Sequence, residues 1–432
     1  MGNCKAARCG VFLLSSILCL IFFSGSFRAD ALTLDEAVRV ALANNRQILV
    51  VKEKIEEARQ RIEEAKAGYL PSVDLSGTYT RLSEAPSMSI PGYGSIEMGK
   101  SDNYMSKLSL TQPLYTSGSL RYANKGASLY YQKSQEDLKN AQNKITFQVK
   151  KAFYAVLLAQ KNMEVTEAAL DQSERHLAVV EDFFKVGVVS KFDLLRTRVE
   201  LANLRPDLVQ ARNNLRLSQE SLANLLSLPS ASLKLEGELS FKPMRITLEE
   251  ALDEALKERS DLKSLELQKE MLEVALKLAE VQNKPTLALL GNYQYQNPSG
   301  GEDKWGGDWN LNVVLSVPLF DGWANRARVA QRRSQVKQID LSLRELGAGI
   351  DLEVKKAFWD VEASEERIYA QEKNIEQAEE ALSIAETQYR NGLITNLEVL
   401  DVQLVLTRAR VSYLKALYDY NIAKAELEKA MK

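Results

Sequence analysis

Long parts of the chain carry apolar residues at spacings of three and four, a pattern typical of helices packed along a seam. One such stretch runs from about 120 to 184, breaks near Gly187 and resumes from about 192 to 226. A shorter stretch over 34–67 contains no proline, and Thr33 stands where a helix cap is expected. The pattern predicts a shorter helix followed by a long helical hairpin.

Four other runs alternate apolar with polar residues, as strands with one apolar and one wet face do. In the last run every second side chain from Trp309 to Leu319 is apolar. Tilted strands of about 9–11 residues cross an outer membrane, and aromatic residues gather near the run ends, as at membrane interfaces. We therefore expect membrane strands, with soluble hairpins packed on the helices as the alternative. The runs lie at about 71–82, 103–116, 285–296 and 308–320.

The order of these elements occurs twice along the chain. The stretch LTLDEAVRVAL from Leu32 returns as ITLEEALDEAL from Ile246, 214 residues later. The stretch VKKAF at 149–153 returns at 354–358, 205 residues later. Such self-similarity is the signature of internal repeats. We predict a first repeat, a connector and a second repeat at 32–228, 229–245 and 246–432, with hairpin tips near 185–191 and 390–396.

The lengths of the helical stretches indicate how they pack. At about 1.5 Å per residue, the outgoing helix of a hairpin reaches ~100 Å, whereas the return helix covers only ~50 Å. The helix over 34–67 supplies the missing length if it stacks end to end on the return helix. The sequence thus predicts a rod about 100 Å long, a shape suited to spanning a compartment.

Four strands are too few to close a membrane barrel, because about eight are the fewest that do so and a polar lumen needs more. Strand edges inside a membrane must nevertheless be paired. Several copies of the chain must therefore share one barrel, and the sequence predicts an oligomer.

The first 31 residues are typical of an export signal, with Lys5 and Arg8 before an apolar run over 11–23 and small residues at 29–31. All three cysteines lie in this segment, so the remaining chain has no disulfide and no thiolate ligand. Whether Cys19 is lipidated stays open.

The overall charge and the near absence of histidine exclude several classes of site. The chain holds 56 Lys and Arg against 58 Asp and Glu, and no basic stripe suited to nucleic acid is present. His176 is the one histidine, so a histidine-built metal or acid–base site is not expected. We expect His176 to have a solvated or interface role on its helix. Composition favours a protein that is not an enzyme and has no cofactor.

One short stretch, GSIEMGKS at 94–101, fits the phosphate-binding pattern G-x-x-x-x-G-K-[ST]. That pattern binds phosphate only when a buried strand precedes it and a helix follows. The residues before Gly94 include two prolines and no apolar run, and a strand-like run follows Ser101. The two copies also differ in length here. We interpret the stretch as a surface loop between the first two strands rather than a nucleotide site.

These features together resemble the TolC family of outer-membrane efflux channels over essentially all of the chain after residue 31. The resemblance rests on the opening LTLDEAVRVALANN, the strand ends QPLY and VPLF, and the turns VGVVSKFD and YRNGLITNLEVLD. It implies a mostly α fold with membrane β, in which long antiparallel coiled-coil hairpins accompany four strands per chain. Three chains would share a 12-stranded barrel in the outer membrane of a Gram-negative bacterium, continued by a helical tunnel through the periplasm.

The resemblance also implies a function and partners. The protein would be the outer-membrane exit duct of a tripartite efflux or type I secretion system. It would act as a homotrimer in outer-membrane lipid, docked with a periplasmic adaptor (membrane fusion) protein and an inner-membrane RND or ABC pump. The connector at 229–245 would lie at the equator of the duct. The pump family and the exported substrate, whether drugs, other small molecules, metal ions or protein, stay open.

Residues of the periplasmic aperture follow by matching the family's motifs. Glu398 and Asp401 fall where family members place acidic rings around the closed entrance, which would favour cations. Tyr389 and Asp193 match a pair that helps to hold the entrance shut. Ile394 departs from the family, whose well-known members carry a gating arginine there. An ordinary solvated helix face is the alternative for both acidic residues.

The hairpin tips are the expected adaptor contacts, again by resemblance. Gly187 and Gly392 stand in the two turns, next to Val186 and Leu393. A tight turn between helices requires glycine in any case, so both roles can hold.

Two other classes of protein compete with an export duct. A nucleotide-driven enzyme is supported only by the GSIEMGKS match. A periplasmic coiled-coil structural or interaction protein without a pore is the second, and the alternating strands argue against it.

Overall fold

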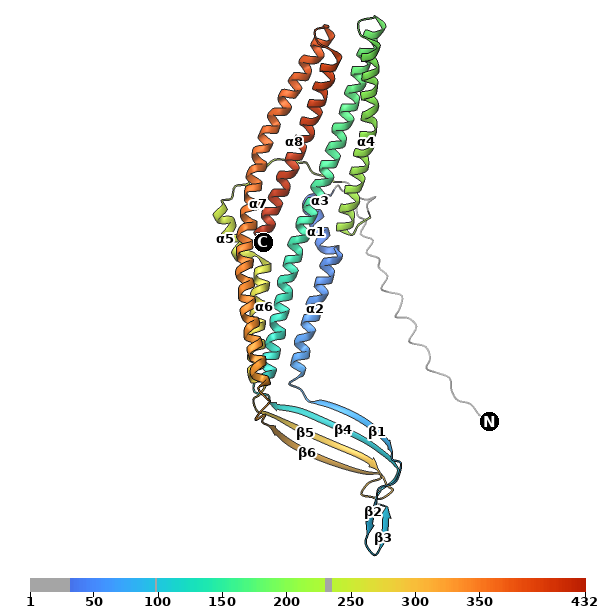
Figure 1. The fold of residues 1–432 in the computed structure, drawn as a ribbon, viewed down its shortest axis with the longest axis vertical. Helices are drawn as coiled ribbons and strands as arrows, with labels where there is room; N and C mark the ends of the chain where they lie inside the picture. Colours follow the sequence, from blue (N-terminus) through green and yellow to red (C-terminus); the bar gives the residue numbers. More distant parts are fainter. Residues whose placement is uncertain (1–31, 98, 230–234) are drawn as a thin grey trace, which may run out of the picture.

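The computed structural model describes residues 32–97, 99–229 and 235–432, so the expected export signal at 1–31 lies outside the described residues. The molecule is a long helical rod with a curved sheet at one end and two hairpin tips at the other (Figure 1). The chain is thus mostly helical with a small antiparallel sheet, as the sequence predicts.

The first helix begins where the sequence predicts, at a capping box. Thr33 Oγ1 accepts a hydrogen bond from the main-chain N–H of Glu36, and the Glu36 carboxylate accepts one from the Thr33 N–H at 3.0 Å. The expected continuous helix over 34–67 is wrong, however. Asn45 has extended backbone angles and divides it into α1 (Leu34–Asn44) and α2 (Arg46–Ala67).

The second half of the chain has the same break. Thr247 and Glu250 form the matching capping box, and Arg259 separates α5 (Leu248–Glu258) from α6 (Ser260–Val281). Arg259 lies 214 residues after Asn45, the offset that relates the two copies. The break is therefore a shared feature of both halves.

Two long hairpins form the body of the rod. The outgoing helices α3 (Ser119–Lys185) and α7 (Ala324–Arg390) have 67 residues each, and their return helices are α4 (Lys191–Leu226) and α8 (Asn396–Ala430). Because α4 reaches only part of the way, α2 covers the half of α3 nearer the sheet, and α6 covers α7 in the same way (Figure 1). This is the end-to-end stacking that the helix lengths predict.

The four predicted strands form one antiparallel sheet in the order β1-β4-β5-β6. The central pair β4–β5 joins the two halves of the chain, with Leu110 opposite Gly291. The last strand ends at Ser316, four residues before the predicted end at 320, since Pro318 has no N–H for a ladder bond. The strands are β1 (Ser72–Arg81), β4 (Asp102–Tyr115), β5 (Thr286–Asn297) and β6 (Gly306–Ser316).

The GSIEMGKS stretch lies at the far end of the sheet, away from the rod (Figure 1). The expectation of a plain loop is wrong in detail, because β2 (Ser87–Ile90) pairs with β3 (Gly94–Glu97) in a small hairpin. Strand β4 follows Ser101, so no helix N-terminus points its amides at the stretch. Lys100 forms an ion pair with Asp303 of the loop between β5 and β6. The stretch lacks the geometry of a phosphate-binding loop.

The main hydrophobic core lies midway along the rod, where both hairpins meet the connector. Phe153 of α3 and Tyr420 of α8 are among its largest fully buried side chains, and Leu239 of the connector is buried against them. Tyr420 also donates from its hydroxyl to the main-chain carbonyl of Lys242 at 2.8 Å. These contacts fasten the connector at mid-height.

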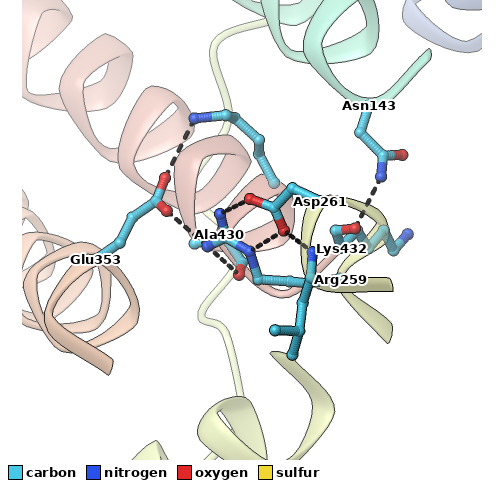
Figure 2. Close-up of polar contacts among 8 residues, drawn as sticks. Asn143, Arg259, Asp261, Glu353, Ala430 and Lys432 are labelled. Carbon is cyan, nitrogen blue, oxygen red and sulfur yellow. Dashed lines mark hydrogen bonds and ion pairs between the residues drawn. The ribbon is translucent and has the colours of Figure 1, made fainter. Parts of the chain in front are cut away.

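A polar cluster at the α5–α6 break holds the end of α8 (Figure 2). The Arg259 guanidinium donates to the carboxylates of Asp261 and Glu353 at 2.6 Å each, and to the Ala430 carbonyl at 3.3 Å. Burial by itself would lower the pKa of Arg259. The charged hydrogen bonds to Asp261 and Glu353 outweigh this effect and raise the pKa above its ordinary value. Lys429 adds a contact to Glu353 at 3.3 Å. The cluster ties α5, α6, α7 and α8 together.

Candidate functional site

The candidate site is the end of the rod that carries the two helix-to-helix turns. Gly187 and Gly392 follow the last residues of α3 and α7 with φ of 81° and 70°. These positive values favour glycine, and a Cβ at either position would meet no atom within 4 Å. Backbone conformation alone therefore accounts for both glycines.

Each return helix begins with a capping box at this end. Ser190 Oγ donates to the Asp193 carboxylate at 2.6 Å, and the N–H of Asp193 donates back to Ser190 Oγ at 3.1 Å. Thr395 and Glu398 repeat the arrangement on α8, with the Thr395 N–H 2.7 Å from Glu398 Oε2. The sequence analysis missed these boxes, although Ser-x-x-Asp and Thr-x-x-Glu are visible in the sequence.

Two acidic side chains at the start of α8 face solvent. Glu398 and Asp401 are both exposed, about one helical turn apart. Hydrogen bonds from the backbone and then the hydroxyl of Thr395 lower the pKa of Glu398. Within the described residues neither carboxylate forms a salt bridge. The tip thus presents negative charge that is not neutralised by the chain itself.

Tyr389 is buried rather than poised at the surface. Its side chain is only 5% exposed and lies in a small cluster with Val180, Leu194 and Val399. Desolvation and then the charge of Asp193 raise the pKa of Tyr389. The residues are therefore neighbours, but within the described part of the chain no hydrogen bond joins them and the Tyr389 hydroxyl has no partner.

Ile394, where the resemblance leads one to expect an arginine, packs against the same cluster. An arginine there would bring a charge to the turn, whereas isoleucine contributes apolar contact. This chain therefore holds the tips partly by burial of apolar surface.

His176 has a role that the sequence analysis did not foresee in this form. It is 7% exposed, and its Nε2 lies 2.7 Å from Oδ1 of Asn396, the first residue of α8. Asn396 Nδ2 in turn donates to the Thr197 hydroxyl at 3.0 Å and to the Asp193 carbonyl at 3.3 Å. Of the two expected roles, the solvated one is wrong and the interface one agrees with this buried contact, whose partner lies 220 residues away and is not visible to sequence reasoning.

The outermost side chains of both turns are apolar and exposed. Val186 and Leu393 are 72% and 73% exposed, and Val188 and Phe192 are also exposed. Exposed apolar patches of this kind are typical of protein–protein contacts. The tip therefore exposes apolar surface beside the acidic residues.

The sheet at the other end of the rod also exposes apolar residues. Trp309 and Leu311 of β6 are 77% and 61% exposed, and Val73 and Leu75 of β1 are exposed on the opposite edge strand. Among the described residues, neither edge strand has a paired strand on its outer side. Such a surface is suited to lipid and to pairing with further strands.

Other kinds of site receive no support from the described chain. Over residues 32–97, 99–229 and 235–432, no helix has the length and apolar character needed to cross a membrane. In the same part of the molecule, no group of three His, Cys, Asp or Glu side chains is arranged to hold a metal ion.

Comparison with curated proteins agrees with the geometry. The outer membrane protein TolC of Vibrio cholerae serotype O1 is 24% identical over 412 residues, which cover 92% of this chain and 90% of the relative. The alkaline protease secretion protein AprF of Pseudomonas aeruginosa is 25% identical over 408 residues, which cover 92% of this chain and 84% of the relative.

Solved structures show the same fold. The outer membrane channel CmeC of Campylobacter jejuni superposes with a TM-score of 0.79 at 17% identity, covering 92% of this chain and 85% of that chain. The open state of the channel MtrE of Neisseria gonorrhoeae gives 0.74 at 18% identity, covering 92% and 88%. The model of the outer membrane efflux protein family matches residues 37–227 and 251–431. The chain therefore belongs to the outer membrane efflux protein family, which confirms its resemblance to TolC.

Proposed function

We propose that the protein is the outer-membrane exit duct of an efflux or secretion system, built from three copies of the chain. The observation that carries the proposal is the four-stranded sheet with two unpaired edges and exposed apolar side chains. Membrane-embedded edges must be paired, and three copies would supply twelve strands with β6 of each copy beside β1 of the next.

The helical rod would continue this barrel as a tunnel. Helices α3 and α7 each extend about 100 Å at 1.5 Å per residue, and the stacked shorter helices keep two layers along their whole length. Three such rods side by side would enclose a path through the periplasm. The two halves of the chain, which carry the same order of helices, would act as internal repeats around that tunnel.

The aperture would lie at the tips, with Glu398 and Asp401 of three chains forming stacked acidic rings. Six carboxylates in a constriction raise the local concentration of cations and repel anions. Tyr389 and Asp193 would help to keep this end closed through burial and proximity, since no hydrogen bond joins them within the described part of the chain.

The partners would be a periplasmic adaptor and an inner-membrane pump of the RND or ABC type. The apolar tips around Val186, Gly187, Gly392 and Leu393 supply a surface for the adaptor. Relatives include a toluene efflux pump protein of Pseudomonas putida and the alkaline protease secretion protein AprF, so small molecules and proteins both stay in range as cargo.

The competing proposal of a periplasmic rod without a pore has less support. A soluble rod would expose Trp309 and Leu311 to water at a cost of about 25 cal/mol for each Å² of apolar surface. A membrane environment or strand pairing removes that cost.

Two measurements test the proposal. Protein extracted from outer membranes should run as a trimer by light scattering and give ion conductance in planar lipid bilayers. A soluble monomer without conductance would contradict the duct and favour the rod.

A further inference from the structure

The joint between β6 and α7 lies at the boundary between an apolar and a charged part of the molecular surface. Exposed apolar side chains continue beyond the end of β6 through Leu319 and Phe320 to Trp323. Along α7 the next large apolar side chain that is strongly exposed is Leu341, whereas exposed arginines begin at Arg326. Aromatic residues next to charged ones are typical of a membrane–water interface. The joint is therefore at the level where lipid headgroups would lie.

A pocket of about 230 Å³ is present at this joint. Its walls come from Asn283 just after α6, from the linker after β6 and from the first turn of α7. Two of the lining side chains are charged, Asp321 and Arg326, and they carry opposite signs. The others include the apolar residues 318–320 and Trp323. The pocket thus combines one positive and one negative group with apolar walls.

Asn325 brings to this pocket a polar atom that the chain itself does not satisfy. Its side chain is only 7% exposed, and within the described residues its Oδ1 has no hydrogen-bond partner. Its main-chain N–H is satisfied, because it donates to the Asp321 carboxylate at 2.7 Å. A buried acceptor without a donor costs free energy. Because Asn325 lines the pocket, a ligand that carries a donor would remove this cost.

The first half of the chain shows that such a joint does not need an asparagine. At the offset of 205 residues, position 325 corresponds to Leu120, the second residue of α3, and Arg326 corresponds to Arg121. Leu120 lies close to Gly68 at the end of α2 and contributes apolar contact there. The arginine is therefore common to both joints, whereas the buried amide belongs to the second joint alone. Packing does not explain the amide, so we looked for a ligand.

The first turn of α7 provides a group that binds anions. The positive end of the dipole of this 67-residue helix lies here. The Arg326 guanidinium carbon lies 5.7 Å from the centre of the Trp323 ring, and within the described residues Arg326 forms no salt bridge. Arginine binds phosphate through two parallel hydrogen bonds. A bare phosphate would meet the nearby Asp321 carboxylate, whereas a ligand with a cationic group beside its phosphate would pair with it.

We propose that this pocket binds the headgroup of a zwitterionic aminophospholipid, such as phosphatidylethanolamine. The ammonium group would donate to Asn325 Oδ1 and to the Asp321 carboxylate, while the phosphate would accept from Arg326. The acyl chains would lie along Leu319 and Phe320 toward the sheet. The site rests on the proposed function only in that the sheet lies in a membrane. Bound lipid would stabilise the joint between strand and helix by mass action.

The test measures lipid binding to the purified wild-type protein in detergent by native mass spectrometry. Phosphatidylethanolamine and phosphatidylglycerol with the same acyl chains are added separately. Phosphatidylethanolamine should bind at least about tenfold more tightly, because phosphatidylglycerol has the phosphate but no ammonium group. Glycerophosphoethanolamine, which is the same headgroup without acyl chains, and inorganic phosphate should not displace the bound lipid at equal concentration. These arms distinguish a lipid from a free phosphate compound.

Variants assign the binding to the pocket. Arg326→Gln should weaken binding of phosphatidylethanolamine at least about tenfold, whereas the matched control Arg121→Gln, at the equivalent position of the first joint, should bind like the wild type. Asn325→Leu introduces the residue of the first joint and should weaken phosphatidylethanolamine more than phosphatidylglycerol. Asp321→Asn can still cap α7 and should reduce the preference between the two lipids. A purely structural role of these residues would not change that preference.

Three results would overturn the lipid site: equal affinity of the wild type for both lipids, an Arg121→Gln control that loses as much binding as Arg326→Gln, or displacement of the lipid by glycerophosphoethanolamine. If Asn325→Leu does not assemble, the two arginine variants and Asp321→Asn carry the test. Failure of the proposed function would look different. A wild-type protein that prefers phosphatidylethanolamine but gives no ion conductance would refute the duct and leave the site intact, whereas a conducting protein without this preference would refute the site alone.

Discussion

Asn45 Nδ2 donates to the main-chain carbonyl of Leu225 at 2.9 Å and fastens the break between α1 and α2 to the end of α4. Arg259 does the same in the second half of the chain, where it donates to the carbonyl of Ala430 at the end of α8. Leu225 and Ala430 are 205 residues apart, the offset that relates the two hairpins. Two different side chains therefore secure equivalent joints at mid-height.

Asn45→Ala should destabilise the protein by about 1–3 kcal/mol. The substitution removes the helix cap to the Gln47 N–H, at 2.9 Å, and leaves the Leu225 carbonyl without this donor. Thermal unfolding in detergent, followed by circular dichroism, measures the change. Asn44→Ala is the matched control, because Asn44 is exposed and should alter stability by less than about 0.5 kcal/mol. Equal melting temperatures for the two variants would contradict a joint at Asn45.

Arg259→Met should cost about 2–4 kcal/mol, since it leaves the partly buried carboxylates of Asp261 and Glu353 without their main partner. The matched control is Arg212→Met, which breaks only an exposed ion pair with Glu167 and should cost less than about 1 kcal/mol. Chemical denaturation of both variants at pH 7 gives the comparison. A loss at Arg259 no larger than that at Arg212 would show that the cluster is dispensable.

The same cluster should make stability depend on acid pH. The carboxylates are desolvated, but the hydrogen bonds and charge of Arg259 prevail and lower the pKa of both Asp261 and Glu353. Their contribution is therefore complete above the unfolded-state values near pH 4 and is lost as pH falls below them. The stability difference between wild type and Arg259→Met should shrink below pH 4. A difference that stays constant down to pH 3 would refute this linkage.

His176 should couple the tips to pH in the range just below neutrality. Burial lowers the pKa of His176, so the joined tips favour the neutral imidazole; the bond to Asn396 and the charge of Glu386 act in the opposite direction. Stabilisation by the neutral form is complete above the ordinary value near 6.5 and is lost as pH falls below it. The other titratable or charged groups around His176 are Arg175, Asp193, Tyr389 and Arg390.

A change from pH 7.5 to pH 5.5 should therefore increase the opening frequency of the wild-type channel more than that of His176→Gln. The glutamine variant keeps the donor but cannot titrate, so it isolates the imidazole from other acidic groups. Because the described chain contains a single histidine, selective ¹⁵N-histidine labelling reports the Nε2–H tautomer directly. Identical pH profiles for both proteins would exclude a role for His176 titration.

Substitution of the acidic tip residues should weaken block by multivalent cations. Glu398→Gln with Asp401→Asn removes six charges from a trimer, while glutamine can still serve at its position in the capping box. The matched control is Asp182→Asn, an acidic residue near the other turn that is already paired with Lys185. Bilayer recordings with added divalent or trivalent cations measure the block. Unchanged block in the double variant would contradict the assignment of Glu398 and Asp401 to acidic rings at the aperture.

Several features of the protein follow from the local pattern of the sequence. Apolar spacing of three and four predicts the long hairpins, and alternation from Trp309 onward predicts a strand with one apolar face, although the strand ends at Ser316. Thr33 marks the start of α1 because a capping box needs only residues three apart. Helix lengths even predict the stacking of α2 on α4 along α3, since a hydrophobic seam must be covered along its whole length.

Other features escaped because they depend on contacts between distant residues. The break at Asn45 has no proline or glycine, and its extended backbone is held by the carbonyl of Leu225 from another helix. The resemblance implies a bond between Asp193 and Tyr389, but the Asp193 carboxylate accepts a hydrogen bond from Ser190 in the local cap, and the nearby Tyr389 hydroxyl has no partner among the described residues.

The sequence by itself determined the periodicities, the caps and the family, because these depend on residue types at fixed short spacings. Only the tertiary structure decided which polar groups meet across the hairpins. His176 and Asn396 are 220 residues apart, and no local rule relates them. Their pairing depends on the way α3 and α8 are brought side by side by the packed core, where each buried polar atom must find a partner.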